Sequence, residues 1–189
     1  MSKTQIKKVD NSNLMDKVDL RVSHLPRKKN IIVLDAFHGA GTIWKSVERK
    51  TEKQIQIIGI EKEPGKNSGL QLEGDNIKFI PTLDLSLYDV IDLDAYGIPY
   101  EILREIFENG TAKAGTSIFA TFIQSLKGRL PVRMLEDLGY TKAMHQKAPI
   151  LLCRNGFEKL MQYLGKWGIK NINYIQRDRK YYFHFKISC

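Results

Sequence analysis

The sequence predicts an α/β domain with a mostly parallel, seven-stranded sheet, a C-terminal antiparallel hairpin, and helices on both faces. Apolar runs of strand length alternate with segments of helical periodicity, the order that produces parallel strands joined by right-handed crossovers. The run at 31–34 is apolar at every position, as in a strand buried on both faces. The last two expected strands flank a short polar segment at 177–179, a spacing typical of a hairpin.

The individual elements follow from hydrophobic periodicity. Short apolar, β-branched or aromatic runs predict strands at 31–34, 56–60, 77–80, 88–93, 117–122, 169–175 and 181–187. Apolar side chains at helical spacing predict helices at 42–51, 100–107, 131–138 and 157–167. The segment 64–76 contains three glycines and a proline and predicts an irregular crossover, whereas 139–155 gives no clear assignment.

Length and charge limit the organisation and the partners. The chain has 189 residues, which suits one domain. We expect a basic N-terminal arm over 1–30, with a short helix near 11–18, followed by one folded domain over 31–189. Lysine and arginine total 30 against 21 acidic residues, a formal net charge of +9. A positive field of this size favours polyanions such as nucleic acid.

Several classes of protein are disfavoured. No apolar run approaches the roughly 18 residues that a membrane-spanning helix needs, and the lysine-rich N-terminal segment lacks the apolar stretch of a signal peptide. The two cysteines, Cys153 and Cys189, and the four histidines are scattered too widely to suggest a disulfide framework or a metal site. We therefore expect a cytoplasmic protein with no membrane association and no structural metal.

A glycine-containing turn follows the first expected strand. Residues 33–42 have the sequence VLDAFHGAGT, so Asp35 ends the strand and Gly39 and Gly41 precede a helix. Glycines let the backbone approach a ligand closely, and the free N–H groups of a helix start can meet its polar groups. Glu61 ends the next strand, twenty positions after Gly41, where a carboxylate can accept both ribose hydroxyls. This order predicts a nucleoside site.

The nucleoside is not expected to belong to a dinucleotide. Trp44 stands where the dinucleotide fingerprint has its third small residue, which packs near the pyrophosphate. The chain also lacks the glycine-rich phosphate loop of nucleotide triphosphatases. The segment 33–42 instead resembles the first motif of class I, Rossmann-like S-adenosylmethionine-dependent methyltransferases, in the form D-x-F-x-G-x-G-T. This resemblance implies a methyltransferase fold, a catalytic domain over 31–189 and S-adenosyl-L-methionine as cofactor.

The same resemblance implies the cofactor-binding residues. Asp35 and the loop from Gly39 to Gly41 would hold the methionine part, and Glu61 the ribose. Asp84, which follows the third expected strand, resembles the acidic residue that meets the adenine amino group, with Asp75 or Asp89 as alternatives. The cofactor-binding set is then Asp35, Phe37, Gly39, Gly41, Thr42, Glu61 and Asp84.

A second motif ends the fourth expected strand. Residues 92–100 have the sequence DLDAYGIPY. They resemble the D-P-P-Y-type motif of DNA and RNA amino-methyltransferases. They are closer to D-[LI]-D-P-[FY]-G-x-P of tRNA guanine N2-methyltransferases, although Ala95 stands where proline is usual. Because the carboxyl ends of parallel strands line one crevice, this segment should face Gly39.

The chemistry of base methylation explains these residue types. An exocyclic amine is a poor nucleophile because its lone pair is delocalised into the ring. The Asp94 carboxylate and the Ala95 carbonyl would accept the two amine hydrogens, while Tyr96 would stack on a base turned out of its helix or loop. These three are the expected catalytic residues. The expected substrate-binding residues are Tyr96, Pro99, Lys127 and Arg129, the two cations meeting phosphates.

The expected function is therefore methyl transfer to an exocyclic amino nitrogen of a nucleic-acid base, with RNA, and tRNA in particular, ahead of DNA. Two alternatives stay open: a methyltransferase acting on a protein or small-molecule amine, and an inactive cofactor-binding module of the same fold. No separate target-recognition domain is evident in the sequence. Specificity would come from the arm, from residues 139–155 or from a partner protein.

Overall fold

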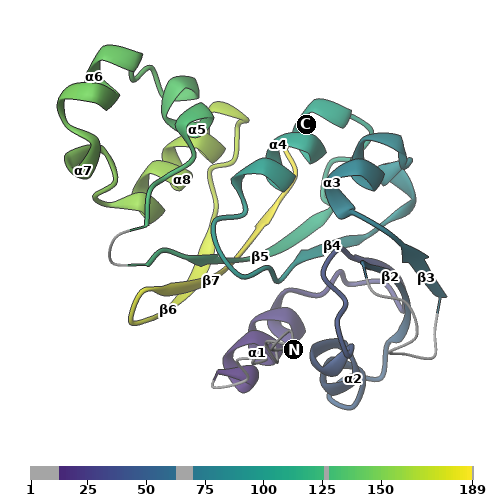
Figure 1. Ribbon diagram of the computed structural model, residues 1–189. Helices are drawn as coiled ribbons and strands as arrows, with labels where there is room; N and C mark the ends of the chain where they lie inside the picture. Colours follow the sequence, from purple (N-terminus) through teal and green to yellow (C-terminus); the bar gives the residue numbers. More distant parts are fainter. Residues whose placement is uncertain (1–12, 63–69, 126–127, 189) are drawn as a thin grey trace, which may run out of the picture.

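The computed structural model describes residues 13–62, 70–125 and 128–188 of the chain (Figure 1). One sheet runs through these residues, and its seven strands are joined mainly by helical connections. The strands are β1 (Asn30–Asp35), β2 (Gln54–Glu61), β3 (Leu70–Glu73), β4 (Val90–Leu93), β5 (Ser117–Ile123), β6 (Asn173–Arg177) and β7 (Lys180–Lys186).

The strand order is β3-β2-β1-β4-β5-β7-β6. The first five strands are parallel, β7 pairs with β5 in the antiparallel sense, and β6 forms a hairpin with β7. The order reverses between β1 and β4, and ligands of open α/β sheets bind at such a switch point, outside the carboxyl ends of the strands. The expected fold class, a mostly parallel sheet with a C-terminal hairpin and helices on both faces, is confirmed.

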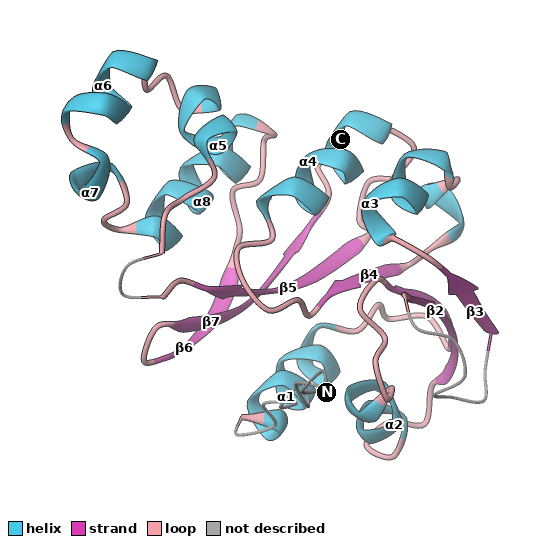
Figure 2. Cartoon of the chain, viewed as in Figure 1, coloured by secondary structure: helices cyan, strands magenta, loops and turns pink. Residues whose placement is uncertain are grey.

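Helices cover both faces of the sheet (Figure 2). They are α1 (Leu14–His24), α2 (Thr42–Glu48), α3 (Asn76–Phe79), α4 (Tyr100–Asn109), α5 (Val132–Asp137), α6 (Lys142–Lys147), α7 (Pro149–Leu152) and α8 (Gly156–Lys166), with 3-10 turns at Ile80–Thr82 and Leu85–Leu87. Helices α1 and α2 pack on one face, where Val18, Trp44 and Val47 are buried against β1, β4 and β5. The α4 and α8 helices pack on the other face.

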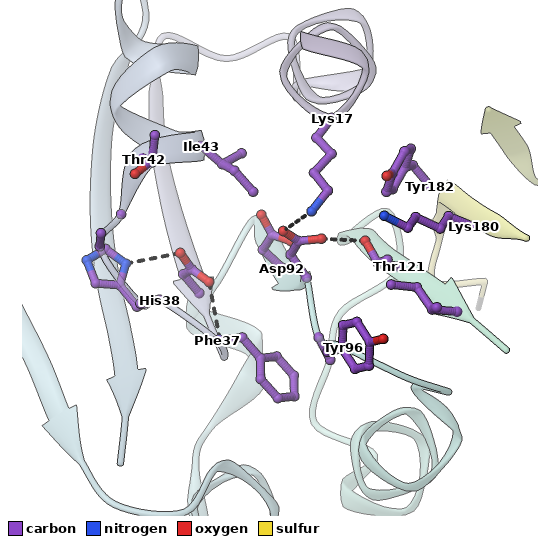
Figure 3. Close-up of a pocket in the computed structure, with 17 residues that line it drawn as sticks. Lys17, Phe37, His38, Thr42, Ile43, Asp92, Tyr96, Thr121, Lys180 and Tyr182 are labelled. Atoms are coloured by element: carbon purple, nitrogen blue, oxygen red, sulfur yellow. Dashed lines mark hydrogen bonds and ion pairs between the residues drawn. The ribbon is translucent and has the colours of Figure 1, made fainter. Parts of the chain in front are cut away.

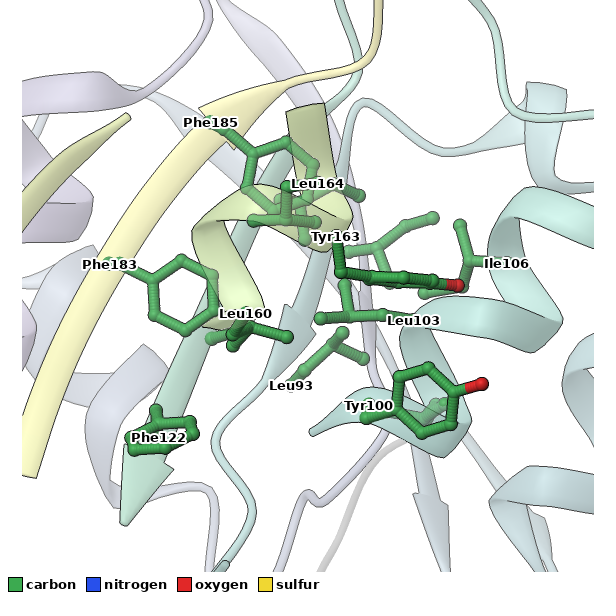
Figure 4. Close-up of a cluster of buried hydrophobic side chains, with 14 of the residues drawn as sticks. Leu93, Tyr100, Leu103, Ile106, Phe122, Leu160, Tyr163, Leu164, Phe183 and Phe185 are labelled. Carbon is green, nitrogen blue, oxygen red and sulfur yellow. The ribbon is translucent and has the colours of Figure 1, made fainter. Parts of the chain in front are cut away.

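The larger core lies between the sheet and helices α4 and α8 (Figure 4). Leu103 and Ile106 of α4 and Leu160 and Leu164 of α8 are spaced three and four residues apart, so each helix turns one apolar stripe toward the strands. The facing side chains include Leu93, Phe122, Phe183 and Phe185. This packing fixes the carboxyl ends of β4 and β5, where the candidate site lies.

The third expected strand is in the wrong place. Residues 77–80 belong to α3 and the 3-10 turn that follows it, because the Asp75 carboxylate caps the helix by accepting the Ile77 N–H at 3.0 Å. The third strand is Leu70–Glu73, in the segment predicted to be an irregular crossover, and it pairs with β2 at the sheet edge. An edge strand needs few apolar residues, so this short run gives a weak sequence signal.

The N-terminal segment is more structured than the expected basic arm. Residues 1–12 lie outside the described residues, but α1 packs against the sheet, and Val18 and Leu20 are buried in the core. Arg21 is 2% exposed. Residues 142–152, in the unassigned segment 139–155, form the short helices α6 and α7. Among the described residues, no helix has the length and apolarity to cross a membrane.

Candidate active site

A pocket of about 240 Å³ opens at the carboxyl ends of β1 and β4 (Figure 3). The loop 37–43 forms one wall and residues 92–96 form the other. Lys17 of α1 and Tyr182 of β7 close the pocket from the side of the terminal hairpin. The two motifs singled out in the sequence therefore face each other across one cavity.

The loop after β1 takes a tight path that glycine makes possible. Gly39 and Gly41 have φ angles of +50° and +66°, the left-handed region that disfavours other residues. The Asp35 carboxylate accepts the Phe37 N–H at 3.3 Å and binds Nδ1 of His38 at 3.0 Å. The bond to Asp35 raises the pKa of His38 above its ordinary value. Phe37 and Thr42 also line the pocket.

Glu61, at the end of β2, meets this loop directly. The Gly39 N–H donates to Oε2 of Glu61 at 2.9 Å, and the Lys62 N–H donates to Oε1 at 3.0 Å. The ring of His38 lies over Gly59 of the same strand, where an added Cβ would come within 2.6 Å of Cγ of the ring. The structure thus brings together the two parts of the predicted nucleoside site, although Glu61 stands beside the pocket and not among its lining residues.

Asp92 and Asp94 of the second motif have different surroundings. Asp92 is 1% exposed, and its carboxylate accepts bonds from Nε and Nη2 of Arg21 at 2.7 and 2.6 Å and from Nε1 of Trp44 at 2.7 Å. Burial raises the pKa of Asp92 above its ordinary value, and the Arg21 guanidinium opposes this shift. These hydrogen bonds hold α1 and α2 against β4 beside the pocket.

Asp94 points toward the pocket and is held by two donors. Nζ of Lys17 bonds to Oδ2 at 2.8 Å, and the Thr121 hydroxyl donates to Oδ1. The side chains of Lys17 and Asp94 are 14% and 12% exposed. Nζ of Lys17 also lies 5.3 Å from the ring centroid of Tyr182. Asp94 is therefore a positioned carboxylate between α1 and β5.

The next residues of the motif leave the sheet. Ala95 and Tyr96 line the pocket, and the Tyr96 side chain is 87% exposed. The loop is fixed just beyond by a bond from the Ile123 N–H to the Gly97 carbonyl at 2.7 Å. An aromatic ring this exposed beside a positioned carboxylate is suited to stacking on a planar ligand.

Two predicted substrate residues, Pro99 and Arg129, do not line this pocket. Pro99 is buried as the residue before α4, where its carbonyl accepts the Leu103 N–H, so it cannot contact a substrate in this arrangement. Arg129 is exposed beside a neighbouring hollow. Lys127 falls outside the described residues.

Asp84 loses the basis of its predicted role because the third strand is Leu70–Glu73. It lies eleven positions after the end of β3 and caps a 3-10 turn by accepting the Ser86 N–H at 3.0 Å. Asp75 is the carboxylate that closely follows β3, and it pairs with Lys62 at 2.8 Å. The adjacent Asn76 amide donates to the Ala36 carbonyl at 2.9 Å, which joins this segment to the loop after β1. Asp89 instead precedes β4, at the amino end of that central strand, opposite the carboxyl ends that form the pocket.

Lys17, Arg21 and His38 are not among the residues predicted from the sequence. The first two lie on α1, in the segment expected to be an arm. Leu14, Val18 and Arg21 occupy one helical face, so periodicity over 14–24 was the available signal for a packed helix. An aspartate in a run as apolar as that of β4 also signals a buried cation somewhere in the fold. Neither kind of sequence signal points to His38.

Comparison with known proteins identifies the fold. No model of a known protein family matches the sequence, and no curated protein matches it. The structure resembles TYW2 from Pyrococcus horikoshii in complex with MeSAdo, with 16% identity over 91% of this chain and a TM-score of 0.51. It also resembles a precorrin-6y C5,15-methyltransferase from Geobacter metallireducens, with 11% identity over 100% of this chain, 93% of that chain and a TM-score of 0.55.

A SAM-dependent methyltransferase from Archaeoglobus fulgidus has 13% identity over 91% of this chain, 93% of that chain and a TM-score of 0.52. The fold is that of class I S-adenosylmethionine-dependent methyltransferases. The chain spans 60% of the length of TYW2 and of a Listeria monocytogenes structure that it also resembles. Within the described residues, no group of three or more histidine, cysteine or acidic side chains could hold a metal ion.

Proposed function

We propose that this protein is an S-adenosylmethionine-dependent methyltransferase that transfers the methyl group to an exocyclic amino nitrogen of a nucleic-acid base, with RNA ahead of DNA. The observation that carries the proposal is the pocket between the loop 37–43 and residues 92–96, which places Asp94 opposite a glycine turn. The fold is consistent with this activity but does not by itself define the substrate.

The pocket fits the charges of S-adenosylmethionine. The cofactor has a carboxylate, an ammonium group and a sulfonium, and it supplies an electrophilic methyl group when bound. Lys17 offers a cation for the carboxylate, while Asp35 offers a buried carboxylate for the ammonium group. A Cβ placed on Gly39 would have no neighbour closer than 3.8 Å, so the turn leaves room for a ligand. Glu61 lies at the end of β2, where it would accept the ribose hydroxyls.

Asp94 would hold and orient the acceptor amine. Its two oxygens already accept bonds from Lys17 and Thr121, but a carboxylate oxygen has two lone pairs, so each oxygen can accept another hydrogen. The bonds from Lys17 and Thr121 fix the carboxylate before the substrate arrives. Direct methyl transfer depends mainly on orientation, so this fixed geometry would supply much of the rate.

Two features favour a nucleic-acid base as the methyl acceptor. The Tyr96 ring, 87% exposed beside Asp94, offers a stacking surface for a flipped or unpaired base. The net charge of +9 favours a polyanion. A small-molecule amine would need neither feature.

The test is transfer of tritium from S-adenosyl-[methyl-³H]methionine to separate pools of RNA, DNA and protein. We expect label in RNA, recovered after digestion as a nucleoside methylated on its exocyclic amine. Label confined to protein would instead support the alternative substrate class. If a protein that binds the cofactor labels none of the three pools, the result would contradict both nucleic-acid and protein substrates.

A further inference from the structure

A groove leads away from the active-site pocket past the end of β5, as a chain of hollows with shared lining residues. The active-site pocket shares Tyr96, Ile123 and Lys180 with a second hollow. That hollow shares Gln124, Arg129 and Arg179 with a third, which we call the α7 hollow. The α7 hollow measures about 750 Å³, within the size range of ligand-binding sites. It is lined in part by Phe122, Gln124, Ile150, Cys153, Phe157 and Tyr181.

The floor of the α7 hollow is held by internal bonds. Nε2 of Gln124, just beyond β5, donates to the Gly128 carbonyl at 3.0 Å and to the Cys153 carbonyl at 2.8 Å. The Leu130 N–H lies 3.4 Å from Sγ of Cys153. A Cβ at Gly156 would come within 2.1 Å of Oε1 of Gln124, so glycine is needed where α8 begins. The hollow is therefore built into the fold and needs no closure to form.

Its lining combines apolar surface with arginine side chains and one carboxylate, that of Glu158. Phe157 and Tyr181 stack with ring centroids 3.9 Å apart and form an aromatic wall. Ile150 of α7 is 80% exposed beside the hollow. Arg154 and Arg179 line the same space, and neither forms an ion pair with another residue in the part of the chain that the structure describes.

We propose that the groove binds single-stranded RNA, with the target base at Asp94 and a neighbouring nucleotide in the α7 hollow. This rests on the proposed function. Apolar and aromatic surface suits the base, and Arg154 and Arg179 suit the phosphates on either side of it. In this arrangement Tyr96 lies between the two base positions, because it lines both the active-site pocket and the connecting hollow. A peptide partner would leave the arginines without partners unless it were acidic.

The test measures the dissociation constant of a fluorescein-labelled single-stranded RNA of about twelve nucleotides. Fluorescence anisotropy reports binding, and the titration is repeated at several salt concentrations. Ile150→Ser removes apolar surface, and Arg154→Gln removes one cation. Leu87→Ser and Arg49→Gln are the matched controls, because Leu87 is 60% exposed and Arg49 is exposed, and neither lines the groove. All four side chains lie at the surface, so the variants should fold.

We expect Ile150→Ser to weaken RNA binding about tenfold without changing the salt dependence. Arg154→Gln should weaken binding and reduce the slope of log K against log salt by about 0.7, the contribution of one phosphate contact to a single strand. Both controls should bind as the wild type does. RNA affinities of Ile150→Ser and Arg154→Gln equal to those of the controls would overturn the proposal.

Two further measurements separate this inference from the proposed function. Calorimetry with S-adenosylhomocysteine tests the cofactor site alone. If the protein fails to bind it while RNA affinity still depends on Ile150 and Arg154, the proposed function fails and the groove stands. Sedimentation tests self-association: if Ile150→Ser dissociates a dimer and leaves RNA affinity unchanged, the α7 hollow is an interface between two copies, and the RNA proposal is wrong.

Discussion

The two sides of the pocket are built differently. On the α1 side, Lys17 is bonded to Asp94 and Arg21 is bonded to Asp92. The two aspartates lie two positions apart at the end of β4. On the far side, neither α6 nor α7, in the segment between β5 and α8, contains a buried residue. The charged groups of the first side are paired within the protein, whereas Arg154 and Arg179 of the second form no ion pair with any described residue.

This contrast indicates that the α1 side orients the reacting groups and that the far side recognises the substrate. Methyl transfer requires a fixed distance and angle between acceptor and methyl group, and groups held by ion pairs and hydrogen bonds lose little freedom when the ligand binds. Substrate recognition instead needs surface that is still available. We therefore expect substitutions on the α1 side to affect folding and catalysis, and substitutions along the groove to affect substrate affinity.

The largest expected effect is on stability, from Arg21→Met. The substitution leaves the Asp92 carboxylate buried without its cation, so the free energy of unfolding should fall by about 3–5 kcal/mol in urea denaturation. Arg177→Met is the control, because Arg177 pairs with Asp16 at the surface and should contribute only a small fraction of this. Equal losses in the two variants would contradict the role of the buried network.

Asp94→Ala should have the next largest effect, and it should act on the rate. We expect tritium transfer to fall about 100-fold or more, because the acceptor amine loses its orienting carboxylate. The dissociation constant of S-adenosylhomocysteine should stay close to the wild-type value. Unchanged turnover would remove Asp94 from the mechanism.

Glu61→Ala should weaken cofactor binding. Loss of charged hydrogen bonds to the ribose should raise the dissociation constant of S-adenosylhomocysteine about tenfold in calorimetry. Asp84→Ala is the matched control, since Asp84 is exposed and caps a 3-10 turn. If the Asp84 variant weakens binding as much as the Glu61 variant, the sequence-based assignment of Asp84 to the adenine site is restored.

The smallest expected effect is a pH dependence of stability. Asp35 raises the pKa of folded His38 above the ordinary value of 6.5, so protonated His38 stabilises the fold. This stabilisation should be complete below pH 6.5 and should be lost as the pH rises through the raised pKa. The difference in unfolding free energy between wild type and His38→Gln should decrease over that range. A difference independent of pH would show that the Asp35–His38 pair is not ionic.

The parts of the site that were predictable from sequence depend on short stretches of chain. The run at 31–34, the glycine turn and Glu61 are each recognisable from local chemistry, and the parallel topology then brings the turn and Glu61 together. The same holds for Asp94 and Tyr96, because a strand end in a parallel sheet faces the ligand crevice. The terminal hairpin was also predictable from its two strands and polar turn.

The site residues that the sequence did not predict depend on contacts between residues that are distant along the chain. Lys17 and Asp94 are 77 positions apart, and Arg21 and Asp92 are 71, so periodicity cannot pair them. The misplaced third strand has a local cause: Ile77 and Ile80 suit a strand as well as a helix, and the Asp75 cap decides for the helix. Moving that strand also changes which carboxylate follows it, from Asp84 to Asp75.

The central claim is that one pocket, bounded by the glycine turn and Asp94, binds S-adenosylmethionine for methyl transfer. Calorimetric titration of the wild-type protein with S-adenosylhomocysteine, the product left after transfer, tests it most directly. We predict saturable binding at one site per chain, weakened in Glu61→Ala and retained in Asp94→Ala. A wild-type protein that is folded and binds neither S-adenosylhomocysteine nor S-adenosylmethionine would contradict the account.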